Sequence, residues 1–81
     1  MIRLTGRIDT TNAGEWEEKL ISAADSELDA EELTYISSAG LRVLLKLKKQ
    51  LGKVEIMNVS PEVFEILDVT GFTDLLDVKQ K

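Results

Sequence analysis

Residues 35–42 read Tyr35-Ile36-Ser37-Ser38-Ala39-Gly40-Leu41-Arg42, and within them the chain changes from a strand-forming to a helix-forming sequence. Tyr35 and Ile36 favour a strand because aromatic and β-branched residues are enriched in strands. Ser37 or Ser38 can cap the helix that follows, since a serine hydroxyl accepts a hydrogen bond from an unpaired amide of the first turn. The segment therefore predicts a short extended piece that leads directly into a helix.

The helix after this junction has one apolar and one basic face. The apolar residues recur at the spacing i, i+3, i+4, i+7 and i+11, and they are Gly40, Val43, Leu44, Leu47 and Leu51. The basic residues are Arg42, Lys46, Lys49 and Lys53. Gly52 predicts the end of this helix, because glycine adopts the left-handed conformation with which many helices end. We therefore expect a helix from Gly40 to Leu51 that packs against a sheet.

On the amino-terminal side, the segment from Ile2 to Asp9 alternates between apolar and polar side chains, which predicts a strand with one wetter face. Its apolar residues are Ile2, Leu4 and Ile8, and its polar residues are Arg3, Thr5 and Arg7.

A helix is expected to follow this strand. Asn12 can cap it, with Glu15 as its partner in a capping box. Apolar residues then follow at helical spacing, and they are Ala13, Trp16, Leu20 and Ala24. We interpret Trp16 as a core anchor between helix and sheet, with a contact to a protein partner as the alternative.

Residues 26–36 give a weaker signal, because acidic residues are poor strand formers. We expect a short strand near Glu27 to Ala30, then a turn, and then Tyr35 and Ile36 leading into the helix.

The carboxy-terminal third predicts a strand, a helix and one further element. Val54 to Val59 predicts a strand with Val54, Ile56 and Asn58 on one face. Ser60 and Pro61 suit the cap and first position of a helix over 61–70, and Gly71 ends it. Residues 72–78 predict a short helix or a final strand, and three apolar residues in them should dock on the core: Leu75, Leu76 and Val78.

Strands and helices thus alternate along the chain. With 81 residues, of which 43% are hydrophobic and 31% charged, the sequence fits one globular domain over 1–81. Alternation of this kind predicts an α/β fold with a small mixed or partly parallel sheet and helices packed mainly on one face.

The amino-acid composition argues against several classes of function. The chain has no cysteine and no histidine, which removes thiolate chemistry, the commonest general base and the commonest transition-metal ligand. A net charge of −5 argues against a direct contact with nucleic acid. The amino terminus has no apolar run long enough for a signal peptide or a membrane span. We therefore expect a cytoplasmic protein that is not an enzyme, binds no cofactor or metal and does not associate with a membrane.

Charge is distributed unevenly along the chain. Residues 15–32 contain eight acids and one lysine, whereas residues 40–53 contain five basic residues and no acid. This asymmetry fits solvated faces, and it also fits a surface that steers a charged protein partner. Leu41 and Leu45 lie beside Arg42 and Lys46, so they predict a leucine patch with a basic rim that suits an acidic groove. The alternative is that both leucines belong to the core.

The serine pair lies at the expected helix start, where unpaired amides and the helix dipole tolerate an anion such as a phosphate. From the residues alone, a double cap is the simpler interpretation and a phosphorylation site is the alternative.

The run YISSAGLRVLL, residues 35–45, resembles the signature of the STAS domain, the fold shared by sulfate-transporter tails and anti-sigma factor antagonists. Residues 6–13, Gly-Arg-Ile-Asp-Thr-Thr-Asn-Ala, resemble the family's Gly-x-(Leu/Ile)-Asp-x-x-x-Ala stretch, and Asp29 matches the aspartate that ends the family's central strand. Two departures stand out. The family's usual first strand is expected to be missing, because Met1 lies only five residues before Gly6, and Ser37 replaces a common aspartate.

The resemblance implies a phosphorylation-controlled antagonist in transcription regulation. The unmodified form would bind an anti-sigma factor that is also a serine kinase, and this partner switching would release a sigma factor. The kinase would then phosphorylate Ser38, with Ser37 as second choice, and a phosphatase would reset the cycle. Asp9 and Asp29 would lie near the phosphate. Partner contacts are expected from Ser37, Ala39, Gly40, Leu41, Arg42, Leu45 and Lys46. The alternative is a STAS module that is never phosphorylated and serves as a scaffold or sensor in a larger assembly.

Overall fold

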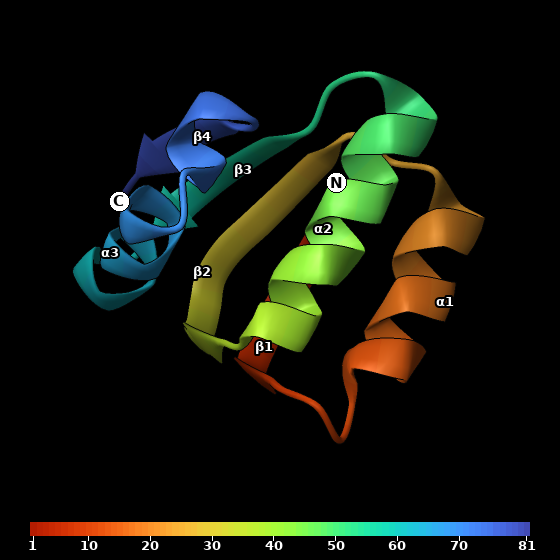
Figure 1. Cartoon of the computed structure of the whole chain (residues 1–81), viewed down its shortest axis with the longest axis horizontal. Helices are drawn as coiled ribbons and strands as arrows, with labels where there is room; N and C mark the ends of the chain where they lie inside the picture. The colour runs from red at the N-terminus through yellow and green to blue at the C-terminus, as the bar shows by residue number, and fades with distance from the viewer.

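Strands and helices alternate from one end of the chain to the other (Figure 1). The structure is a computed structural model that describes all residues, 1–81. The elements are β1 (Ile2–Ile8), α1 (Ala13–Ala23), β2 (Glu27–Ile36), α2 (Ser38–Leu51), β3 (Glu55–Val59), α3 (Pro61–Val69), the short 3₁₀ helix η1 (Phe72–Asp74) and β4 (Asp77–Gln80). Residues 72–80 thus contain both of the elements that the sequence offered as alternatives.

The four strands form one sheet in the order β1-β2-β3-β4, and every neighbouring pair is parallel. Right-handed crossovers between strands in this order place the connecting helices on the same face. In Figure 1, α2 lies in front of β1 with α1 beside it. The predicted α/β fold with helices on one face is confirmed, and the sheet is wholly parallel rather than mixed.

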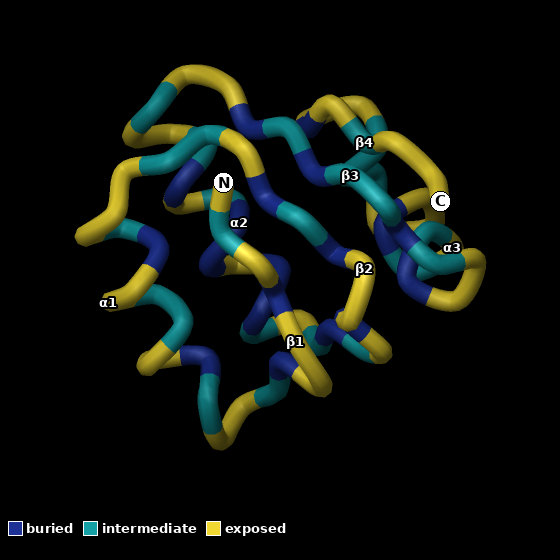
Figure 2. Tube along the Cα trace, turned by 180° about the vertical axis from the view of Figure 1, so that it is seen from behind, coloured by how far each residue is buried: buried dark blue, intermediate teal, exposed yellow.

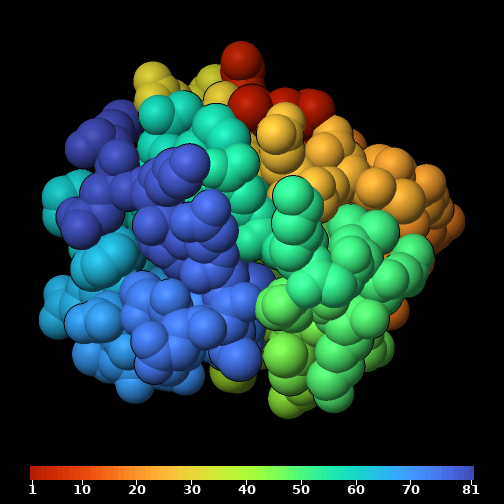
Figure 3. Space-filling view, turned by 90° about the horizontal axis from the view of Figure 1, so that it is seen from above, coloured from red at the N-terminus to blue at the C-terminus, as the bar shows by residue number.

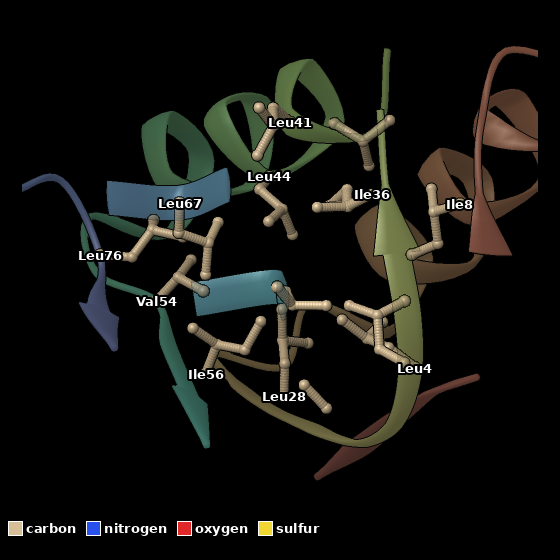
Figure 4. Packing of buried hydrophobic residues seen from close by; sticks show 14 of the residues in the cluster. Leu4, Ile8, Leu28, Ile36, Leu41, Leu44, Val54, Ile56, Leu67 and Leu76 are labelled. Atoms are coloured by element: carbon tan, nitrogen blue, oxygen red, sulfur yellow. The ribbon is translucent and has the colours of Figure 1, made fainter. Parts of the chain in front are cut away.

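The core lies between the sheet and its helices. It contains 18 buried residues, and nine of them are completely buried, including Leu4, Leu28, Leu47 and Ile56. Figure 4 shows side chains from the strands, α2 and α3 converging on this space. In the space-filling view, α1 and α2 form one side of the surface and the chain from α3 onward forms the other (Figure 3).

β2 is one continuous strand of ten residues, so the turn expected in its middle is wrong. Its register against β1 shifts by one residue at two places, and the first lies where Arg3 is opposite Asp29 but Thr5 is opposite Glu32. This bulge lets Leu28 and Ala30 on one side of it and Leu33 beyond it all face the core. Figure 2 shows buried stretches of β2 separated by exposed ones, and the alternation is interrupted where two successive residues, Glu31 and Glu32, are exposed.

The acids of β2 lie on the sheet face that carries no helix, where cations from the neighbouring strand meet them. Arg3 pairs with Glu32 at 3.3 Å and with Asp29 at 4.0 Å. The guanidinium of Arg7 stacks over the ring of Tyr35 at 4.3 Å. Because the acids on this face stay in contact with water and Asp29 and Glu32 pair with Arg3, they destabilise the strand less than their low strand propensity suggests.

Asn58 breaks the alternation of β3. Its backbone is in the left-handed region, with φ at 59°, which asparagine tolerates better than most residues. Val59 is therefore buried in the place where alternation predicted Asn58. The amide nitrogen of Asn58 instead donates to Asp29 Oδ1 at 3.0 Å, which ties β3 to β2.

The ends of the helices mostly follow the sequence. Ser60 accepts a hydrogen bond from the amide of Val63, Pro61 is the first residue of α3, and Gly52 ends α2 in the left-handed conformation. Trp16 packs against the core as expected, although it is only half-buried. Two expected core contacts are wrong: Ala24 is an exposed left-handed cap, and Leu75 is 43% exposed, whereas Leu76 is buried.

We expect Leu47→Ala to lower the free energy of unfolding by about 2–5 kcal/mol, because Leu47 is fully buried and the surrounding core cannot close the cavity completely. Urea denaturation followed by circular dichroism measures this loss. Lys49→Ala on the exposed face of the same helix is the control, with a change within about 0.5 kcal/mol. Equal midpoints for the two variants would contradict the assignment of this core face.

Stability should also depend on the ionisation of Asp29. The hydrogen bond from the Asn58 side chain, and then that from the Glu31 amide, hold the pKa of the Asp29 carboxyl below its usual value. A carboxyl with a lowered pKa in the folded state stabilises the fold above its unfolded-state pKa, and this contribution is lost as the pH falls through the folded-state pKa. Asp29→Asn should therefore lose less stability than the parent between about pH 5 and about pH 2. Parallel urea denaturation series test this, and superimposable pH dependence in the two proteins would refute it.

Candidate functional site

The carboxyl ends of β1 and β2 meet at one edge of the sheet. Ile8 lies opposite Ile36, and the amide of Ser37 donates to the carbonyl of Ile8 at 2.8 Å. The turn after β1 and the start of α2 therefore lie side by side. In open parallel sheets, binding sites gather at this carboxyl edge.

The two serines at this edge have different roles. Ser37 is the cap of α2, because its backbone is extended and its hydroxyl accepts from the amide of Gly40 at 3.3 Å. Ser38 is the first residue of the helix, its side chain is exposed, and its hydroxyl makes no hydrogen bond within the protein. The cap therefore uses Ser37 and leaves Ser38 chemically free.

Gly40 explains why the helix can start so close to the strands. A Cβ on this residue would lie 2.6 Å from Cγ1 of Ile36 and 2.8 Å from Cγ2 of Ile8, closer than real Cβ atoms approach. Only a glycine lets the first turn of α2 rest directly on the ends of β1 and β2. This contact fixes the position of the first turn of α2, and with it Ser38, relative to the sheet.

The turn after β1 is held by its own side chains. The carboxylate of Asp9 accepts from the hydroxyl of Thr11 at 2.6 Å and from the amide of Thr11 at 3.0 Å. These two bonds, the hydroxyl first, lower the pKa of the Asp9 carboxyl. Thr11 was not among the site residues expected from the sequence, although an aspartate commonly accepts from the amide two residues further on in such turns.

Asn12 does not form the expected capping box. Its backbone is not extended, and its side chain makes no hydrogen bond to the amides of α1. Asn12 Oδ1 instead accepts from the amide of Asp9 at 2.8 Å, and Asn12 Nδ2 donates to the carbonyl of Arg7 at 2.8 Å. Asn12 therefore fastens the turn to β1, and Asp9 directly follows Ile8, the residue whose carbonyl accepts from the Ser37 amide.

Asp29 is not near the serines, so that expectation is wrong. It lies seven residues before the end of β2, which corresponds to roughly 20 Å at about 3.3 Å per residue. Its contacts are with Arg3 and Asn58 on the sheet face without helices.

The residues of α2 expected to contact a partner divide into two groups. Gly40 and Leu41 are buried, so Leu41 belongs to the core and the expected patch of two exposed leucines is wrong. The others lie on the outer face, where Arg42 and Lys46 are exposed and Ala39 and Leu45 are half-buried. We define the Ser38 surface as the residues Ser38, Ala39, Arg42, Leu45 and Lys46.

The charges of this surface differ in how freely they can act. Lys46 pairs with Glu17 of α1 at 3.1 Å. Arg42 makes neither an ion pair nor a hydrogen bond. The free cation on the Ser38 surface is therefore Arg42.

No group of acidic side chains is arranged to hold a metal ion. A small hollow is lined mainly by charged residues at the amino ends of β2, β3 and β4, the sheet edge opposite Ser38. None of the helices is both long and apolar enough to cross a membrane.

Comparison with known proteins finds similarity along the whole chain. A family model described as the STAS domain matches residues 1–81. An anti-sigma-B factor antagonist of Bacillus subtilis is 30% identical over 88 aligned positions, which cover 99% of this chain and 81% of that relative. A putative anti-sigma factor antagonist of Bordetella bronchiseptica, BtrV, is 36% identical over 84 positions, which cover 93% of this chain and 72% of that relative.

We expect Gly40→Ala to lower the free energy of unfolding by about 1–3 kcal/mol, because the new methyl group would press on Ile8 and Ile36. Gly14→Ala is the matched control. A Cβ there meets nothing within 4 Å, and alanine in α1 should leave stability equal or raise it by up to about 1 kcal/mol. Thermal or urea unfolding distinguishes the two, and an equal response to both substitutions would contradict the close approach at Gly40.

Proposed function

Because the chain belongs to the STAS domain family, we propose that it is an anti-sigma factor antagonist whose binding is controlled by phosphorylation of Ser38. In the unmodified form it binds an anti-sigma factor that is also a serine kinase, and the sigma factor is released. The same kinase then modifies Ser38 and ends the binding, and a phosphatase restores the free hydroxyl. The chain itself performs no catalysis in this cycle and works in the cytoplasm.

The observation that carries the proposal is the division of roles between Ser37 and Ser38. An acceptor hydroxyl must reach the active site of a kinase, and that of Ser38 is exposed and unbonded. The hydroxyl of Ser37 is half-buried and occupied by the Gly40 amide. A kinase would have to break the cap of α2 to modify Ser37, so Ser38 is the preferred acceptor.

In the modification step, the oxygen of Ser38 attacks the γ-phosphorus of a nucleoside triphosphate bound to the kinase. The new bond joins Ser38 Oγ to the γ-phosphorus, the bond from that phosphorus to the oxygen bridging it to the β-phosphorus breaks, and the nucleoside diphosphate leaves. The hydroxyl proton passes to a base of the kinase. Hydrolysis by the phosphatase reverses the result, with water supplying the oxygen of the released inorganic phosphate.

The added phosphate should block docking without unfolding the domain. It carries roughly −1.5 to −2 charges at neutral pH. At the start of α2 this charge faces unpaired amides and the positive end of the helix dipole, which stabilise it. In a protein interface the same hydrated anion would have to lose water without compensation, which is costly. Nearby Asp9 adds repulsion.

We expect the chain isolated from its native cells to carry one phosphoryl group, seen by intact mass and located at Ser38 by fragmentation. Ser38→Ala should lose the modification and still capture a partner with serine kinase activity toward the parent chain. Ser38→Asp should stay folded and capture that partner much more weakly.

Ser37→Ala separates the two serines, because it should remain phosphorylated although its helix cap is weakened by about 1 kcal/mol. Stoichiometric phosphorylation of Ser38→Ala would show that another residue is the acceptor. An unmodified chain under all growth conditions would favour a scaffold or sensor module instead.

A further inference from the structure

Arg42 follows Ser38 by one turn of α2. Residues four apart on a helix are neighbours on its surface, with about 5–6 Å between their Cβ atoms. Helical side chains lean toward the amino terminus, so a residue covers the turn before its own. From this geometry we expect the long side chain of Arg42 to reach over the turn that begins at Ser38.

No acid already occupies this guanidinium. The helix contains no carboxylate from Ser38 to Leu51. In the neighbouring elements, Glu17 of α1 is paired with Lys46, and Asp9 of the turn after β1 is bonded to Thr11. Arg42 is thus an exposed arginine without a partner, held one turn from an exposed hydroxyl.

The order of the two residues also suits an ion pair. Pairs at this spacing are more stable when the acid precedes the base along the helix. A phosphate on Ser38 would precede Arg42 in this way, and its three oxygens match the planar fork of a guanidinium, which can donate two parallel hydrogen bonds.

We propose that Arg42 is the internal counter-ion of phosphorylated Ser38, so that phosphorylation withdraws a cation from the Ser38 surface as well as adding an anion. This inference rests on the proposed function, since it describes how that site is regulated. An acidic partner that approaches the modified chain finds the guanidinium already bound. The switch then removes an attraction and adds an obstacle in one step.

The pairing can be tested without a kinase. The full chain is prepared with phosphoserine at position 38, and the phosphorus resonance is titrated by NMR in the parent, Arg42→Gln and Lys49→Gln proteins. A bound guanidinium favours the doubly charged phosphate. The second ionisation constant should therefore be roughly twofold larger in the parent than in Arg42→Gln. Lys49→Gln is the matched control, because Lys49 is exposed on the same helix but two further turns away, and it should titrate like the parent.

Two further measurements make the test specific. High salt should reduce the difference between the parent and Arg42→Gln, because an exposed ion pair is screened. Phosphoserine placed at position 37 instead should titrate identically with and without Arg42, since residues five apart do not share a helix face. Identical titration of the parent and Arg42→Gln with phosphoserine at position 38 would overturn the inference.

These outcomes are separate from those of the proposed function. A chain that is never phosphorylated in its native cells would remove the biological switch and leave the measured pairing unchanged. An absent pairing would leave the phosphorylation cycle possible, with blockade by the phosphate alone.

Discussion

The close approach of α2 to the ends of β1 and β2 is the constraint on which the rest of the site depends. It exists because position 40 has no side chain, so that the helix rests directly on Ile8 and Ile36. The amide of Ser37 completes the junction by bonding to the carbonyl of Ile8. With both contacts in place, the first turn of α2 has one height and one orientation. The cap, the exposed hydroxyl of Ser38 and the outer face of the helix follow from that placement.

Much of this arrangement could be predicted from the sequence because it depends on local signals. The apolar spacing of α2, the glycine at its end and the Ser60-Pro61 start of α3 each act through neighbouring residues, and each was interpreted correctly. The serine pair was located, but only the structure assigns the cap to Ser37. That assignment depends on where β1 ends, which is a contact between distant parts of the chain.

The errors have the same origin. The acids of β2 looked unfavourable for a strand because Arg3 of β1, which meets them across the sheet, is not visible in the local sequence. Asn58 was placed by alternation, whereas its left-handed backbone changes which residue faces the core. Asn12 has the residue type of a cap, but the tight turn uses its side chain to hold Asp9 and Arg7. Leu41 lies off the main stripe of α2 and is nevertheless covered by the core.

A wholly parallel sheet with one bare face is uncommon, because such sheets usually have helices on both sides. Here the bare face is made compatible with water by charged and stacked pairs across the strands, including Arg3 with Glu32, Arg7 over Tyr35 and Lys79 with Glu55. The two faces of one sheet thus have separate roles. One face packs against the helices to form the core, and the other presents charged and polar side chains to water.

The separation of the cap at Ser37 from the free hydroxyl at Ser38 has a consequence for the life of the protein in a cell. A modification that broke a helix cap would raise the unfolded fraction, and proteases and chaperones act on unfolded chains. A modification at Ser38 leaves the cap intact, so under the proposed cycle the phosphorylated, inactive form would be degraded no faster than the unmodified one. Inactive molecules could then accumulate as a reservoir. The number of active molecules could rise again by removal of a phosphate, without new protein synthesis.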